Sequence, residues 1–103
     1  MFYHAVLMEL KDADASFLAR VREYEQRIRI ELPYVRDYRF GPNVATRARQ
    51  FSWAVLGAFS SPADHDRYQV SDVHQEMKAF MAPHIADLVV CDIDTAQEAP
   101  GHG

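Results

Sequence analysis

Residues 2–10 alternate along the chain, yet both faces of the alternation are mostly apolar. One face carries Phe2, His4, Val6, Met8 and Leu10, and the other carries Tyr3, Ala5, Leu7 and Glu9. An alternating segment that is apolar on both sides is typical of a strand inside a sheet whose two faces are covered. The pattern predicts an inner first strand and places His4 among positions that otherwise belong to the core.

A helical period follows the first strand. Apolar residues recur at helical spacing up to about residue 32, at Phe17, Leu18, Val21, Tyr24, Ile28 and Leu32. Asp12 or Asp14 can cap the start, because a short acidic side chain accepts hydrogen bonds from the first free amides. Pro33 ends the segment, since the residue before a proline avoids the helical region.

Two further strands are predicted in the middle of the chain. Residues 34–40 mix polar and aromatic positions, and Gly41-Pro42-Asn43 interrupts this second strand before a polar loop. Residues 51–59 give the clearest alternation of the chain, with the larger side chains on one face. These are Phe51, Trp53, Val55 and Phe59, with Gly57 between them.

The remaining segment predicts a helical pair and a last strand. Ser61-Pro62 begins a helix that runs to about Val70, because serine suits the cap and proline the first helical position. Ser71 or Asp72 begins a second helix that carries Val73, Met77, Phe80 and Met81. Residues 86–94 read as the last strand, and residues 95–103 have no apolar pattern, which predicts a mobile tail.

The order of these elements predicts a fold in the α+β class. Strand, helix, strand, strand, helical pair and strand form the ferredoxin-like βαββαβ arrangement, here one domain over residues 1–94. Helices on one face of a four-stranded antiparallel sheet leave the other face bare. That face would be apolar, with alternate valine or cysteine positions of the last strand on it and, from the other strands, Tyr3, Ala5, Leu7, Ser52, Ala54, Leu56 and Ala58. We therefore expect a homodimer in which two such sheets cover each other.

Charge and cysteine content exclude several classes of protein. The formal net charge is −4, and nine of the eleven basic residues are arginines scattered among acids, which argues against nucleic acid as a partner. Cys91 is the single cysteine and lies in an apolar strand, so we interpret it as a small buried hydrophobe rather than a reactive thiol. The first apolar run ends at Glu9, too soon for a signal peptide or a membrane span, so no membrane partner and a cytoplasmic location are expected.

Three side chains of acid/base type fall near the predicted core. Tyr68 and His74 lie at the junction of the two short helices, and His4 lies in the first strand. An imidazole such as His74 can remove a proton next to a carbonyl, a phenol such as Tyr68 can donate to the enolate oxygen, and His4 can orient either. Five further residues are predicted to line a cavity for an apolar small molecule: Tyr24, Trp53, Phe59, Met77 and Phe80.

Each of these residues also has a structural interpretation. His4 can hydrogen-bond a backbone carbonyl inside the core, and Tyr68 and His74 can bond to each other and fix the helix junction. Aromatic and methionine residues at this spacing normally fill a core. His65 and His84 have polar or helix-end contexts and are expected at the surface or as caps.

Neither a metal nor a cofactor is expected from the sequence. His4, His74, Asp72 and Asp92 are of ligand type, but no two histidines stand one helical turn apart as in metalloenzymes. The chain has four glycines, two of them in the tail, and no glycine-rich loop suited to phosphate.

These features together resemble the stress-responsive dimeric α/β-barrel family, often called Dabb. The resemblance covers residues 2–94: the histidine in His4-Ala5-Val6-Leu7, Leu32-Pro33 before the second strand, Gly41-Pro42-Asn43 after it, an aromatic third strand, Tyr68 and His74, and Asp92. It implies a homodimer whose two sheets form a barrel.

The resemblance also implies a chemistry for the matching residues. A plant member of the family is a cofactor-free polyketide cyclase, in which the positions matching Tyr68 and His74 are catalytic and the one matching His4 lines the pocket. The chain departs from the family where the usual His-Pro between them is Ser71-Asp72. Families with the same barrel include cofactor-free monooxygenases.

Two functions remain open at this point. One is a cofactor-independent, cyclase-like acid/base enzyme for a carbonyl or phenolic compound, and the other is a ligand-binding or stress-protective dimer without turnover.

Overall fold

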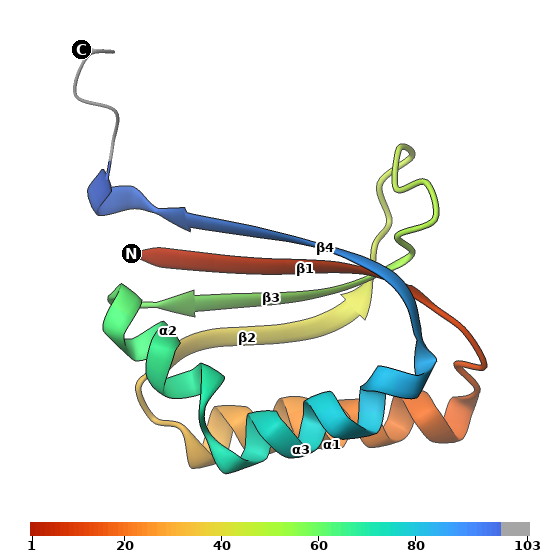
Figure 1. The fold of residues 1–103 in the computed structure, drawn as a ribbon, viewed down its shortest axis with the longest axis horizontal. Coiled ribbons are helices and arrows are strands. Elements are labelled where there is room, and N and C mark those ends of the chain that lie inside the picture. Colours follow the sequence, from red (N-terminus) through yellow and green to blue (C-terminus); the bar gives the residue numbers. More distant parts are fainter. Residues whose placement is uncertain (98–103) are drawn as a thin grey trace.

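The computed structural model of the protein describes residues 1–97, which form one four-stranded sheet with helices on one side (Figure 1). Its main elements are β1 (Phe2–Leu10), α1 (Ala15–Glu31), β2 (Val35–Pro42), β3 (Trp53–Phe59), α2 (Pro62–Gln69), α3 (Asp72–Met81) and β4 (Ile85–Asp94). Two short 3₁₀ turns, η1 (Ala82–His84) and η2 (Thr95–Gln97), flank β4. The strands are antiparallel in the order β2-β3-β1-β4. The predicted ferredoxin-like βαββαβ fold is confirmed.

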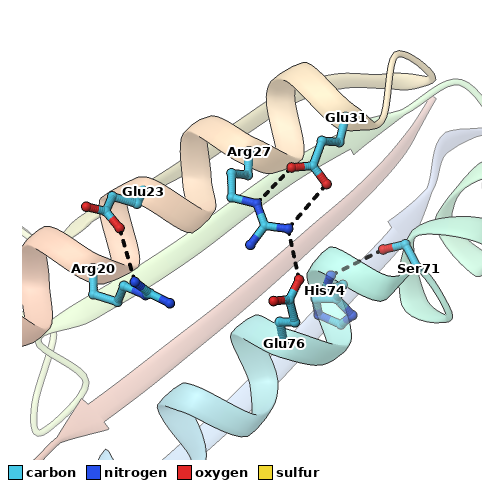
Figure 2. Close-up of polar contacts among 7 residues, drawn as sticks. All are labelled: Arg20, Glu23, Arg27, Glu31, Ser71, His74 and Glu76. Atoms are coloured by element: carbon cyan, nitrogen blue, oxygen red, sulfur yellow. Dashed lines mark hydrogen bonds and ion pairs between the residues drawn. The ribbon is translucent and has the colours of Figure 1, made fainter.

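The three helices begin where local capping signals predict. The side chain of Asp14 accepts from the Phe17 amide at 2.8 Å, and Ser61 Oγ accepts from the Asp64 amide at 3.2 Å. Ser71, rather than Asp72, caps α3, and its Oγ accepts from the His74 amide at 3.3 Å (Figure 2). Each cap satisfies an amide that has no partner inside its helix.

The boundaries of the two middle strands differ from the prediction. β2 continues through Gly41 and Pro42, which were expected to end it. β2 is an edge strand, and a proline is tolerated there because its missing amide is not needed by a neighbouring strand. β3 begins at Trp53 rather than Phe51, because the Asn43 side chain and backbone bind the carbonyls of Phe51 and Ser52 and fold that segment into the loop.

The core lies between the helices and one face of the sheet. α1 packs on β2, and α3 lies beside α1, so the helices gather toward the β2 side while β4 lies at the far edge (Figure 1). The side chains of Val21, Ile28 and Phe59 are completely buried there. Arg27 joins the two helices, binding Glu31 at 2.7 Å and Glu76 at 2.9 Å (Figure 2). These pairs are exposed, so they contribute little beyond orientation.

The opposite face of the sheet is apolar and uncovered in the single chain. β1 is the inner strand that its sequence predicts, paired with β3 on one side and β4 on the other. The register aligns Tyr3, Ala58 and Ile93 in one row across the three strands. Cys91 follows in the next row and is exposed in the single chain, contrary to its interpretation as a buried hydrophobe, because no layer covers this face of the sheet.

The C-terminal segment begins with an ordered contact. The Thr95 amide donates to the carbonyl of Met1 at 2.9 Å, and η2 follows. Residues 98–103 of the predicted tail lie outside the described residues, and the boundary of the domain at residue 94 stays a prediction. Among residues 1–97, no helix is long and apolar enough to span a membrane.

Helix α1 also protects the edge of β2. The buried carboxylate of Glu25 accepts from the Phe40 amide at 2.8 Å, and Arg22 donates to the Phe40 carbonyl at 3.3 Å. Both backbone groups point away from β3, where an edge strand otherwise has no partner. Two side chains of α1 thus provide hydrogen-bond partners for the backbone of Phe40 at this edge.

We expect Glu25→Ala to lower the free energy of unfolding by about 1–3 kcal/mol, because the Phe40 amide would remain buried without an acceptor. Urea denaturation measures the effect. Glu23→Ala is the matched control: Glu23 lies on the exposed side of α1 and pairs with Arg20 at 3.6 Å (Figure 2), so its loss should be nearly neutral. Equal effects of the two substitutions would contradict the role given to Glu25.

Candidate functional site

A mostly apolar cavity of about 340 Å³ lies between α3 and the sheet. This size is within the range of small-molecule pockets. It exists because the helices do not cover the inner face of β4, where Leu88 and Val90 line the cavity and remain about half exposed. The lining residues are His4, Val6, Met8, Tyr38, Val55, Tyr68, Gln69, His74, Met77, Lys78, Met81, Ala82, Ile85, Leu88 and Val90.

The three predicted acid/base residues all line this cavity. Tyr68 comes from the end of α2, His74 from the first turn of α3 and His4 from β1. The rings of Tyr68 and His74 are 4.1 Å apart, and those of His4 and Tyr68 are 5.9 Å apart. Buried polar groups therefore gather at one end of an otherwise apolar space.

Tyr68 is hydrogen-bonded to a tyrosine that the sequence analysis did not single out. Its hydroxyl lies 2.8 Å from that of Tyr38, which in turn lies 3.6 Å from Met77 Sδ. Burial raises the pKa of both phenols above their usual value, so each keeps its single proton. Either hydroxyl can donate to the other, and the direction decides whether Tyr68 has a proton left for a third group.

His74 is held by the backbone rather than by Tyr68. Its Nδ1 lies 3.3 Å from the carbonyl oxygen of Gln69, which can only accept, so Nδ1 carries the proton. Nε2 then has the free lone pair. It has no hydrogen-bond partner among residues 1–97, and no fully buried side-chain nitrogen or oxygen there lacks one, so Nε2 reaches accessible space.

Desolvation controls the charge of His74. Burial lowers its pKa from 6.5 to about 4; the Gln69 carbonyl opposes this shift, and interaction with Lys78, and to a lesser extent with His4 and His65, reinforces it. The ring is therefore neutral near pH 7.

His4 pairs with a side chain rather than with a backbone carbonyl. Its Nδ1 lies 2.6 Å from Asp92 Oδ1, across the antiparallel pair of β1 and β4 in which these two residues are directly opposite. The carboxylate accepts from Nδ1–H and leaves Nε2 as the acceptor when the ring is neutral. His4 thereby has a fixed tautomer and orientation.

His65 is buried, contrary to its predicted place at the surface. Its ring stacks on Phe2 at 4.5 Å and lies 4.7 Å from His4, while Gln69 Nε2 is 3.0 Å from its Nε2. The helical period carries the missed signal, because His65 lies one turn before Tyr68 and shares its face of α2. His84 agrees with its predicted helix-end role, since its Nδ1 is 3.0 Å from the Lys11 carbonyl.

Four of the five predicted lining residues lie outside the cavity; only Met77 lines it. Trp53 stacks on Phe40 at 5.4 Å, and Phe59 is completely buried in the core. Tyr24 and Phe80 pack together at 5.8 Å between α1 and α3. Apolar spacing predicted burial for these residues, but it could not distinguish the packed part of the core from the part left open beside β4.

Lys78 was also missed in the sequence analysis. It is exposed, lines the cavity and lies one turn after His74 on α3, so its ammonium places a positive charge near the opening.

Comparisons with known proteins agree with the fold. The sequence profile of the family described as Stress responsive A/B Barrel Domain, or Dabb, matches residues 2–95. A comparison with curated proteins gives no match to the chain.

Several solved structures are similar to this chain. A dimeric ferredoxin-like protein of unknown function from Jannaschia sp. has 21% identity and a TM-score of 0.80, over 91% of this chain and 98% of that one. A second such protein, from Thermobifida fusca, has 22% identity and a TM-score of 0.76, over 89% and 88%. A hydroxynitrile lyase from Passiflora edulis has 18% identity and a TM-score of 0.80, over 96% of both chains. At these identities the likeness concerns the fold.

The lowered pKa of His74 predicts a pH dependence of stability. Between pH 6.5 and about 4 the unfolded chain binds a proton at this ring and the folded chain does not, so stability falls as the pH falls. The loss reaches on the order of 3 kcal/mol at the lower end. His74→Asn keeps a donor for Gln69 and removes the titration, so urea denaturation should show a shallower loss in the variant. Parallel curves for the two proteins would contradict the lowered pKa.

Proposed function

Because this chain belongs to the stress responsive A/B barrel domain family, we propose that it is a cofactor-independent acid/base catalyst for a small carbonyl or phenolic acid. The observation that supports the proposal most is the free Nε2 of a neutral, buried His74 whose ring lies 4.1 Å from that of Tyr68, in the wall of an apolar cavity. A base and a donor so close together suit enolate chemistry.

In the proposed reaction, His74 Nε2 removes a proton from the carbon next to a carbonyl. The electron pair of the C–H bond moves onto the carbonyl oxygen, and the resulting enolate accepts a hydrogen bond from Tyr68. The enolate carbon then attacks a second carbonyl of the same molecule, and the new alkoxide takes the proton back from His74. No oxidant, reductant or cofactor is consumed in this cyclase-like sequence.

Tyr38 determines whether Tyr68 can donate a hydrogen bond to the enolate in this step. In one arrangement the Tyr38 hydroxyl donates to Tyr68, and the Tyr68 proton is free for the ligand. In the other, the Tyr68 hydroxyl donates to Tyr38, and the Tyr38 hydroxyl donates to Met77 Sδ. Sulfur is a weak acceptor, so an enolate oxygen in the cavity favours the first arrangement.

The basicity of His74 depends on the charge of the ligand. A pKa of about 4 keeps Nε2 unprotonated but gives it a weak affinity for protons. A negative charge beside the ring raises the pKa, because it favours the imidazolium. Lys78 at the opening favours ligands with a carboxylate, which is why we propose an acid as the substrate.

A second candidate function is ligand binding without turnover. It is favoured by the hydroxyl pair, since Tyr38 and Tyr68 satisfy each other without any substrate. In that case the cavity holds an apolar acid, and the dimer serves as a stress-protective carrier.

We expect a panel of aromatic and polyketide-like carbonyl acids to contain a compound that raises the Tm of the wild type. Chromatography with mass spectrometry should detect a cyclic isomer of that compound with unchanged mass. His74→Asn should lower the turnover rate by about 10²-fold or more, and Tyr68→Phe should also lower it. His84→Asn is the matched control, because His84 lies outside the cavity and asparagine keeps a donor for the Lys11 carbonyl.

If a compound binds but is not converted, the catalytic proposal is wrong and the protein is a ligand-binding protein, as in the second candidate function. Absence of both binding and turnover across the panel would contradict the two functions alike.

We further propose that the chain forms a homodimer through the uncovered face of its sheet. That face carries exposed apolar side chains, among them Tyr3, Leu56, Val89 and Ile93, and a patch of this kind normally meets another protein surface. Two of the similar solved structures are described as dimeric.

Analytical ultracentrifugation at micromolar concentration should give the mass of two chains. Leu56→Lys should give single chains, because dimerisation would bury an unpaired ammonium. Val44→Lys is the control: Val44 is also an exposed apolar residue, but it lies in the loop between β2 and β3 and not on a strand of the sheet. A single-chain mass for the wild type would contradict the dimer.

A further inference from the structure

We infer that His4, His65 and Asp92 form a binding site for a divalent transition-metal ion of the zinc type. One ring nitrogen of each histidine and one carboxylate oxygen of Asp92 lie within 4.8 Å of one another. The three residues come from β1, α2 and β4, which meet at one end of the sheet. This inference concerns binding and is independent of the proposed function.

The donor set suits zinc and its neighbours in the first transition row. Two imidazole nitrogens and one carboxylate oxygen are a common set of protein ligands for a zinc ion that keeps a position for water or substrate. Ligands of a tetrahedral zinc ion are about 3.3 Å apart, as its bond lengths of about 2 Å require. The three donors need only small side-chain movements to reach that separation.

The burial of the two histidines and the contacts that hold the His65 ring favour a metal site over a chance cluster of ligand-type residues. Both histidines are buried, whereas Asp92 is about 38% exposed, so an ion has a path from solvent. Gln69 lies 3.0 Å from His65 Nε2, and Phe2 stacks on the same ring, so its orientation is fixed.

The hydrogen bond between His4 and Asp92 changes when an ion binds. Where His4 binds the ion through Nδ1, the proton that this nitrogen donates to Asp92 must leave, so binding releases one proton. His4 also lines the cavity, so an ion held here would lie at the cavity wall.

Cobalt(II) is the probe for the test, because its visible absorption reports coordination directly. The untagged wild type should bind one Co(II) per chain in a saturable titration, and Zn(II) should displace it. His65→Leu should weaken binding by more than about tenfold, since loss of a ligand costs at least as much as loss of an outer contact. Leucine suits the apolar surroundings of Phe2 and Phe59, and circular dichroism verifies the fold of the variant.

Asp92→Asn is a second variant that keeps an acceptor for His4 and removes the charge, and it should also weaken binding by more than about tenfold. His84→Asn and His102→Gln are controls for the other histidines and should bind as the wild type does. The inference is overturned if the wild type shows no saturable binding of one ion per chain. It is equally overturned if His65→Leu binds Co(II) as tightly as the wild type, since His65 would then serve only as an aromatic surface for Phe2.

Discussion

The incomplete cover of the sheet decides where this protein can hold another molecule. Its three helices gather toward β2, so the inner face of β4 has no helix against it (Figure 1). Leu88 and Val90 remain half exposed on that face, and the space between them and α3 is the cavity. The polar residues that matter, His4, Tyr68 and His74, lie where the packed core meets this open space.

The same residues are kept neutral or hydrogen-bonded by their surroundings. Burial lowers the pKa of His74 and raises that of Tyr68, so both are neutral near pH 7. His4 differs, because Asp92 lies opposite it across the strand pair and gives its ring a charged acceptor. An apolar cavity thus contains one free imidazole nitrogen, one phenol linked to a second phenol and one imidazole bound to a carboxylate.

The fold could be predicted because its signals are local. The caps of α1, α2 and α3 and the alternation in β1 and β3 are each visible within about ten residues of sequence. Pro42 misled the prediction, because only the sheet order shows that β2 is an edge strand where proline is tolerated. Cys91 misled it for another reason, since it lies on the face of the sheet that no helix covers.

The site could be predicted only in part. His4, Tyr68 and His74 were found as titratable or hydroxyl groups among apolar positions. Tyr38 was not, since its partner lies on another element, and His65 was missed although it shares a face of α2 with Tyr68. Trp53 and Phe80 were expected at the cavity because spacing indicates burial and does not tell which buried side chain borders an opening. The pairing of His4 with Asp92 depends on strand register, which no local pattern specifies.

The proposed chemistry depends most on the state of His74, which should present an unprotonated Nε2 to the cavity. Nitrogen-15 NMR of the imidazole rings measures this directly. It should show the Nδ1–H tautomer at neutral pH and a titration near pH 4. A proton on Nε2 at neutral pH would mean that the ring has no free base to offer to the cavity, and the proposed chemistry would fail with it. A titration near 6.5 would contradict the lowered pKa that burial gives this ring.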